Sequence, residues 1–339
     1  MRKLPLGLLL GLGLVSSTGF AQPFSSAPYK IVATAKVGGA GGFDYVTADP
    51  VGRRLYIPRG DRVTVFDLDT LASVGAVPET AGVRGAAVDP VSHHGFSSSK
   101  PVVMWDTRTL ATLKTIPVEG NPDGILFEPA TSRIWVLSHR APNVTVIDAK
   151  DGSIVGTIDL GGAPEQAQSD GQGRVFIDIE DKDKIAVVDA RALKVTATYD
   201  LAGKGGTPAG LALDIKNRIL FACCRNPATC VILNADTGKI IATLPIGAGT
   251  DGAVFNASTM EAFSSQSDGT LTVIKENSPT SFEVVQTVTT KPGAKTSTLD
   301  PKTNRVLLIT VDREPAALGK KAGRGAVVPD SFTILAVGR

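Results

Sequence analysis

Seven residues recur at one position of a repeated pattern, each five residues before the end of a short apolar run. They are Asp44, Arg84, Asp123, Glu165, Ala209, Asp251 and Lys295. Six of the seven are ionisable, although charged residues make up 20% of the chain. If the repeats close around one axis, these side chains meet as a charged collar. A collar of this kind could bind a small cation, a polar ligand or a side chain of a partner protein.

The same charges could instead neutralise one another. Arg84 could pair with Asp123, and Lys295 with Asp44 or Asp251, so that the collar simply lines a hydrated channel. The residue types alone leave a ligand site and a set of internal ion pairs as open alternatives.

Neighbouring segments add further polar candidates to the collar. These are Arg59, His139, Arg140, Glu180, Asp181 and Arg225. A hard divalent cation would suit the carboxylates of Asp44, Asp123, Glu165 and Asp251, because such ions prefer oxygen ligands. His139 is the only histidine expected on this side, which argues against a centre with several histidine ligands. We therefore expect no cofactor, with a cation at the channel carboxylates as the alternative.

The elements that must position these residues are repeated along the chain. An apolar run, then Asp or Asn, a polar turn and a second apolar run, begins at Val63, Val102, Val144, Ile185, Cys230 and, more loosely, Leu271. The starts are 39, 42, 41, 45 and 41 residues apart. A period near 40 residues indicates an array of like structural units.

Each unit contains four short apolar runs rich in Val, Ile and Thr. Residues 121–161 show this most clearly, with GILFE, RIWVLS, NVTVID and SIVGTIDL separated by turn-forming residues. These compositions are typical of strands, and no sustained 3.6-residue period indicates a long helix. Both faces of such a sheet are apolar, so both must be covered. Radial stacking of the sheets as the blades of a propeller achieves this.

The first runs end at seven similar points, which predicts seven blades. The ends are Asp49-Pro50, Asp89-Pro90, Glu128-Pro129, Asp170-Gly171, Asp214-Ile215, Asn256-Ala257 and Asp300-Pro301. The last unit, whose first run ends at Asp300, supplies only three strands, whereas YKIVATAKVGG from Tyr29 matches a fourth strand. We predict an all-β, seven-bladed propeller of four-stranded antiparallel blades whose last blade is closed by the N-terminal strand.

These features resemble the exported seven-bladed propellers of the YVTN-repeat, YncE-like family. The resemblance covers essentially all of the chain after residue 21, and is carried by the period, the Asp-Pro ends and the turn Asp236-Thr237-Gly238-Lys239. No unit spells YVTN; the equivalent stretches begin at Tyr56, Trp135 and Phe176. The resemblance implies the propeller fold and a scaffold used for several tasks.

The first 21 residues are typical of a secretory signal peptide. MRK is followed by an apolar run and by Gly19 and Ala21, small residues that suit cleavage before Gln22. We expect residues 22–339 to form one propeller domain, periplasmic or secreted, monomeric and without a membrane anchor. Without Arg2 and Lys3 the 35 basic residues become 33, against 33 acidic ones. A neutral chain argues against nucleic acid as a partner.

Two local features complete the expectations. Cys223, Cys224 and Cys230 lie within eight residues, so a disulfide between Cys230 and either Cys223 or Cys224 is expected in an oxidising compartment.

The segment 312–330 is longer than most hairpin loops and could be a flap over the channel or an insertion without a role.

The leading functional hypothesis is a scaffold that binds a small polar ligand or a protein partner through the collar. The sequence contains no nucleophile-elbow, phosphate-loop or zinc-finger motif, and it shows no recognisable set of catalytic groups. The alternatives are a lactonase-like or metal-assisted hydrolase that uses the carboxylates with His139 and Arg140, and a DNA-binding propeller.

Overall fold

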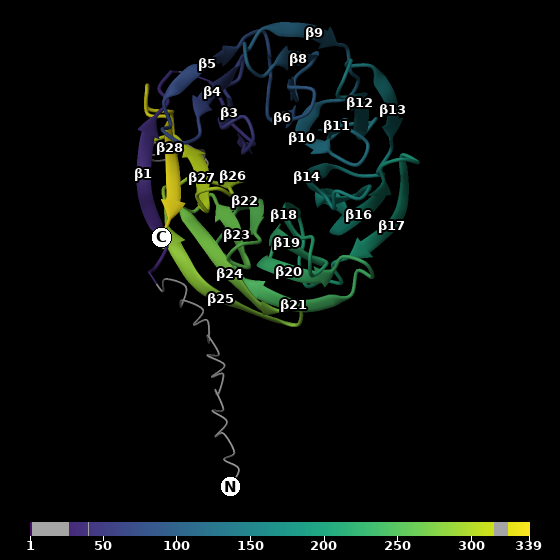
Figure 1. Cartoon of the computed structure of the whole chain (residues 1–339), viewed down its shortest axis with the longest axis vertical. Helices are drawn as coiled ribbons and strands as arrows, with labels where there is room; N and C mark the ends of the chain where they lie inside the picture. The colour runs from purple at the N-terminus through teal and green to yellow at the C-terminus, as the bar shows by residue number, and fades with distance from the viewer. Residues whose placement is uncertain (2–26, 40, 315–324) are drawn as a thin grey trace.

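The protein is a seven-bladed β-propeller. The computed structural model describes residues 1, 27–39, 41–314 and 325–339. Seven four-stranded sheets lie around a central axis (Figure 1), and neighbouring strands within each sheet run antiparallel. The predicted fold class and blade count are therefore confirmed. The predicted signal peptide, apart from Met1, and residues 315–324 of the 312–330 segment lie outside the described residues.

The strands follow one another in meander order from the channel to the rim. Blade 1 contains β2 (Thr47–Asp49), β3 (Arg54–Pro58), β4 (Val63–Asp67) and β5 (Ser73–Val77). Blade 2 contains β6 (Ala86–Asp89), β7 (His94–Ser97), β8 (Val102–Asp106) and β9 (Thr112–Ile116). Blade 3 contains β10 (Pro122–Glu128), β11 (Arg133–Ser138), β12 (Val144–Asp148) and β13 (Ile154–Ile158). Blade 4 contains β14 (Pro164–Ser169), β15 (Arg174–Ile179), β16 (Lys184–Asp189) and β17 (Lys194–Asp200), with a 3₁₀ turn, η1 (Glu180–Lys182), after β15.

The remaining blades repeat the arrangement. Blade 5 contains β18 (Pro208–Asp214), β19 (Ile219–Arg225), β20 (Ala228–Asn234) and β21 (Ile240–Pro245). Blade 6 contains β22 (Thr250–Asn256), β23 (Glu261–Gln266), β24 (Thr270–Ser278) and β25 (Ser281–Thr289). Blade 7 contains β26 (Ser297–Asp300), β27 (Arg305–Thr310), β28 (Thr333–Gly338) and β1 (Lys30–Lys36).

Blade 7 is built from both ends of the chain, as predicted. β1 pairs antiparallel with β28, from Lys30 opposite Gly338 to Lys36 opposite Thr333. Figure 1 shows the two strands side by side in the colours of the opposite chain termini. Tyr29 donates a 2.6 Å hydrogen bond from its hydroxyl to Glu261 Oε2, and Arg339 contacts the other oxygen of Glu261 at 2.6 Å. Residues from both termini are thus tied to blade 6.

Side-chain caps explain why the first strands end where they do. Asp49 Oδ1 accepts hydrogen bonds from the backbone N–H groups of Val51 and Gly52, at 3.0 and 2.9 Å. Glu128 does the same for Ala130 and Thr131. A carboxylate that satisfies the next two or three amides stabilises a tight turn and stops the strand. In blades 1 to 5 the Asp or Asn that ends the third strand, such as Asp67 in blade 1, caps the next turn in the same way.

The apolar core is divided between the blades. Each of the seven interfaces between neighbouring blades holds its own cluster of buried apolar side chains. Trp135 on β11, for example, packs between blades 3 and 4, and Phe176 on β15 packs between blades 4 and 5. Each sheet therefore buries both faces, as the continuous apolar runs predicted. Burial of each large side chain contributes about 1.5–3 kcal/mol.

Arg59 has a packing role instead of the collar role suggested by its loop position. Its guanidinium lies 3.5 Å from the centroid of the Phe332 ring and donates a 2.9 Å hydrogen bond to the carbonyl oxygen of Gly38. Burial lowers the pKa of Arg59 to about 10. The residue joins blade 1 to both strands that close blade 7.

The described part of the chain holds no helix of the length and apolarity needed to cross a membrane.

Candidate binding site at the channel mouth

The predicted collar residues come from equivalent places in different blades. Asp44, Arg84 and Lys295 precede first strands, whereas Asp123, Glu165 and Asp251 lie at the start of β10, β14 and β22. Because each lies the same distance before a capped turn, the propeller brings them to one end of the channel. Two further residues join them from the ends of second strands: His139 follows β11, and Arg225 ends β19.

Eight side chains at this end form a closed ring in which acidic and basic groups alternate. In order these are Asp44, Arg84, Asp123, His139, Glu165, Arg225, Asp251 and Lys295. The separations are 3.1 Å for Arg84 to Asp44, 3.3 Å for Arg84 to Asp123, 3.0 Å for His139 to Asp123 and 3.7 Å for His139 to Glu165. Arg225 lies 3.6 Å from Glu165 and also contacts Asp251. Lys295 contacts Asp251 and lies 3.3 Å from Asp44, which closes the ring.

The ring contains the three ion pairs that the sequence suggested as internal partners. Arg84 meets Asp123, and Lys295 meets both Asp44 and Asp251. The acids are the buried partners, since the Asp123, Glu165 and Asp251 side chains are at most 8% exposed, whereas that of Arg84 is 50% exposed. A buried carboxylate is stable only when neighbouring charges or hydrogen bonds replace water. The alternation supplies that compensation.

His139 holds the ring's titratable positive charge. Its close contact with Asp123 raises the pKa of His139 to about 9, against a smaller opposing effect of burial. Burial raises the pKa of Glu165 to about 7, although the Tyr45 hydroxyl donates to Glu165 Oε2 at 2.6 Å and lowers it. Since the imidazole has the higher pKa, the proton stays on His139 at neutral pH. When Glu165 is ionised, the eight-membered ring carries four positive and four negative groups.

The other predicted residues lie at or beside the ring. Glu180 contacts Arg225 at 2.9 Å and so adds a fifth acid. Asp181 accepts a 2.7 Å hydrogen bond from the Ala163 N–H and contacts Lys182 instead of the ring. Arg140 is exposed and makes no ion pair within the described ranges. Ala209 is the one collar position without a charge, and Arg225 of the same blade takes its place.

Sequence reasoning missed two residues beside the ring. Tyr45 holds Glu165, and its position next to Asp44 was the only available signal. Asp178 on β15 is fully buried, and neither carboxylate oxygen has a hydrogen-bond partner among the described residues. Burial, with Cys223 and Glu165 nearby, raises the pKa of Asp178 well above its ordinary value. Its signal in the sequence was a lone acid within the apolar run RVFIDI.

A cavity of about 1040 Å³ opens beside the ring. Lys295 belongs both to the ring and to the cavity wall, which otherwise includes Phe43, Pro292, Asp312, Asp330 and Phe332. The wall combines aromatic surface with charged groups of both signs. A space of this size is at the upper end of the range for small-molecule pockets.

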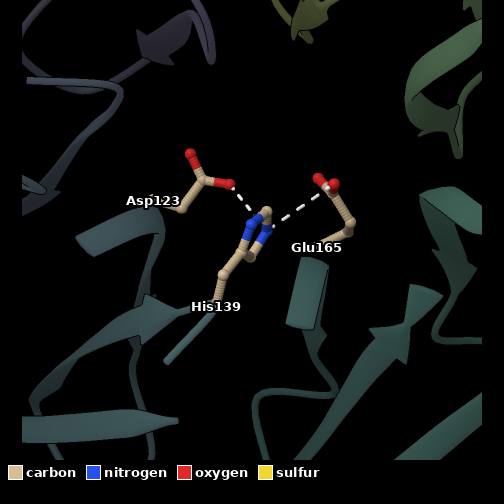
Figure 2. A group of neighbouring side chains, drawn as sticks. All are labelled: Asp123, His139 and Glu165. Atoms are coloured by element: carbon tan, nitrogen blue, oxygen red, sulfur yellow. Dashed lines mark ion pairs between the residues drawn. The ribbon is translucent and has the colours of Figure 1, made fainter. Parts of the chain in front are cut away.

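Only part of the predicted carboxylate set could share one cation. Arg84, Arg225 and Lys295 lie between the four carboxylates. Within the described ranges, the group of at least three metal-ligating side chains that converge is Asp123, His139 and Glu165, whose ligand atoms all lie within 4.8 Å of one another. Figure 2 shows the imidazole between the two carboxylates.

The three cysteines lie on blade 5 as free thiols. Cys223 lies directly opposite Cys230 on the neighbouring strand, with the sulfur atoms 2.8 Å apart, and both face blade 6. Cys224 faces blade 4, because successive side chains of a strand point to opposite faces. Of the two pairings that the sequence left open, this geometry favours Cys223 with Cys230. The disulfide itself stays a prediction.

Refolding the reduced protein with oxidised glutathione is expected to link Cys223 to Cys230. Burial raises the pKa of Cys230 well above its ordinary value, so oxidation of the native thiols should be much slower. Mass spectrometry of non-reduced tryptic peptides should find the peptide that ends at Arg225 joined to the one containing Cys230. The link should survive Cys224→Ala and vanish in Cys223→Ala. The reverse pattern would contradict the pairing.

Comparisons with known proteins identify the fold. No family model matches the chain, and no curated protein matches its sequence. A chain in a structure titled "Crystal Structure of Mitotic Checkpoint Complex" is similar in fold, with a TM-score of 0.71 and 12% identity, over 89% of this chain and 96% of that one. A second, titled "Structure of U3-55K", has a TM-score of 0.74 and 10% identity, over 91% and 99%. These likenesses support the propeller fold. The resemblance to YVTN-repeat proteins stays a prediction.

Proposed function

We propose that this protein is an exported binding scaffold whose channel mouth holds a ligand or partner that carries both charges. The observation that carries the proposal is the closed ring of alternating charges, next to a cavity of about 1040 Å³ that shares Lys295 with it. Export is supported by the N-terminal sequence pattern alone.

The closed ring selects the kind of ligand. A ligand with one charge that separates a ring pair leaves the other member of that pair without compensation, which is costly where the acids are buried. A ligand with adjacent cationic and anionic groups can open one link and restore both contacts. Amino-acid zwitterions and neighbouring acidic and basic side chains of a protein have this chemistry.

A protein partner fits the fold as well as a small ligand does. One chain of similar fold belongs to a structure described as a mitotic checkpoint complex, so this architecture is used in protein assemblies. The likeness supports the scaffold class and says nothing of which partner is bound. DNA binding is less favoured, because each basic residue of the ring already faces acids.

Thermal unfolding with three probes tests the proposal. The dipeptide Arg-Asp, agmatine and succinate carry both charges, positive charge only and negative charge only. We expect Arg-Asp to raise the melting temperature by a few degrees at millimolar concentration, and the other two to raise it less. Arg225→Gln should abolish the shift.

Arg174→Gln is the matched control. Arg174 forms a comparable ion pair with Asp170, 3.0 Å away, at the opposite end of β15 from the ring. The control should keep the full response to Arg-Asp. Equal responses to all three probes, or an unchanged response in Arg225→Gln, would exclude the ring as the binding site.

A further inference from the structure

One link of the ring differs from the others in having a nitrogen ligand between two buried carboxylates. His139 Nε2 lies 3.0 Å from Asp123 Oδ2 and 3.7 Å from Glu165 Oε1. The Asp123 and Glu165 side chains are each 7% exposed, whereas that of His139 is 32% exposed. The three side chains come from β10, the loop after β11, and β14, so that two neighbouring blades build the group (Figure 2).

We propose that Asp123, His139 and Glu165 bind a divalent transition-metal ion of the zinc class at the channel mouth. Ligand atoms about 2.0–2.2 Å from a zinc ion lie about 3.3–3.6 Å apart at tetrahedral angles. The two observed separations bracket that range, so small rotations of the side chains suffice to place an ion between them. The half-buried imidazole leaves the channel side open for a water molecule or a ligand.

The hydrogen bonding of the group points to a ligand. Asp123 Oδ1 and His139 Nε2 are buried atoms without an aligned hydrogen-bond partner among the described residues. The short contact of Nε2 with Asp123 is therefore an ion pair whose N–H is poorly directed. Because a metal binds along the direction of the nitrogen lone pair, an ion between the carboxylates would satisfy Nε2. The ion takes the place of the imidazole proton.

Neighbouring groups hold the two carboxylates in position. The Tyr45 hydroxyl donates to Glu165 Oε2 at 2.6 Å, which leaves Oε1 toward His139. Arg84 Nε lies 3.3 Å from Asp123 Oδ1, which leaves Oδ2 toward His139. Such outer contacts orient metal ligands in proteins. Around the group, five carboxylates contact only three permanent cations, Arg84, Arg225 and Lys295, and this excess of negative charge favours a further cation.

The nitrogen ligand also selects the metal. Imidazole suits zinc, copper, nickel and cobalt, whereas calcium and magnesium prefer oxygen alone. The inferred site therefore differs from the hard-cation site of four carboxylates considered from the sequence. The inferred metal site also differs from the binding site for a doubly charged ligand proposed above. The experiments below measure binding of the metal ion directly, so the two proposals can fail separately.

Titration of tag-free, chelator-treated protein with ZnCl₂ in a calorimeter tests the inference. We expect saturable binding of one ion per chain. His139→Ala and Asp123→Asn should each weaken it by more than about tenfold. His94→Ala is the matched control, since His94 contacts the carbonyl oxygen of Ala149 and lies outside the ring. It should bind zinc as the unmodified protein does.

Cobalt identifies the ligands independently of variant stability. Co²⁺ added to the unmodified protein should give visible d–d bands of a nitrogen and oxygen site, which zinc abolishes by competition. A sulfur-to-cobalt charge-transfer band would place the ion on the cysteines and overturn the assignment. Absence of saturable zinc binding, or binding that persists in both Asp123→Asn and His139→Ala, would overturn it as well.

Discussion

A chain that begins at Val37 is expected to lose its cooperative native state, whereas one that begins at Gln22 should melt as the full-length protein does. The shorter chain lacks β1 and leaves the edge of β28 unpaired. It also removes Tyr29 and Ile31 from the cluster between blades 6 and 7. Each large apolar side chain contributes about 1.5–3 kcal/mol, and total stabilities are about 5–15 kcal/mol. The loss of these two side chains, together with the loss of all strand pairing to β28, removes most of the total stability.

Circular dichroism melts and size-exclusion chromatography of the two chains measure this effect. The chain from Val37 should show an early, shallow transition and should associate, because an exposed strand edge pairs with other chains. A synthetic peptide of residues 27–38 should restore a sharp melt by occupying the vacant edge. A Val37 chain that stays monomeric and melts within a few degrees of the Gln22 chain would show that β1 does not close the ring.

Glu276→Gln is expected to stabilise the protein above neutral pH. Glu276 is 2% exposed, and its Oε1 accepts a 2.7 Å hydrogen bond from Asn217. Its Oε2 and Asp214 Oδ2 are both buried without a partner in the described hydrogen bonds, and the two carboxyl groups interact. A proton on Glu276 that points to Asp214 would satisfy both atoms. Burial, with Asp214 nearby, raises the pKa of Glu276 from 4.5 to about 7.

The sign of the pH dependence follows from that shift. Between pH 4.5 and about 7 the folded protein binds the Glu276 proton more tightly than the unfolded chain does. Stability from this group is therefore complete below pH 4.5 and is lost as the pH rises through 7. The loss amounts to about 3 kcal/mol, at about 1.4 kcal/mol per pKa unit. A glutamine keeps the acceptor for Asn217, supplies an N–H to Asp214 and never ionises.

Urea unfolding at pH 4.5, 6 and 8 tests the prediction. The difference in free energy of unfolding between Glu276→Gln and the unmodified protein should be smallest at pH 4.5 and largest at pH 8. Taking the difference removes the contribution of other carboxyls that titrate in this range, such as Glu165. Glu283→Gln, at an exposed position on β25, is the control and should show no such trend. A difference that does not change with pH would contradict the shared proton.

The fold could be predicted because its determinants are local and repeated. Each first strand ends at a residue such as Asp49 that caps its own turn, so the blade count could be read from the chain. The closure could be predicted because the last repeat supplies only three strands, while an unassigned strand-like segment follows Tyr29. The capped turns fix where the strands end, and the apolar runs require both faces of each sheet to be covered. Few folds other than a closed propeller meet both conditions.

The candidate site could be predicted only where its residues follow the same spacing. Asp44, Arg84 and Lys295 were placed because each precedes a capped turn by five residues. No spacing shows that Arg225 crosses from the end of β19 to replace Ala209, or that Tyr45 donates to Glu165. These contacts depend on side-chain direction across blades.

The cysteines show the same limit. Strand alternation places Cys223 and Cys224 on opposite faces, but only the hairpin register decides which one faces Cys230. That register follows from the pairing of Arg225 with Ala228 around a two-residue turn.

The seven separate apolar clusters bear on how such a protein can change over evolutionary time. Because no described cluster extends across more than one interface, a substitution that alters packing between blades 2 and 3 leaves the fit between blades 5 and 6 untouched. Compensating changes therefore need to arise only in one adjacent blade. Side chains can be replaced interface by interface while the circular architecture persists, and the propeller fold is shared by chains with about one residue in ten identical to this one.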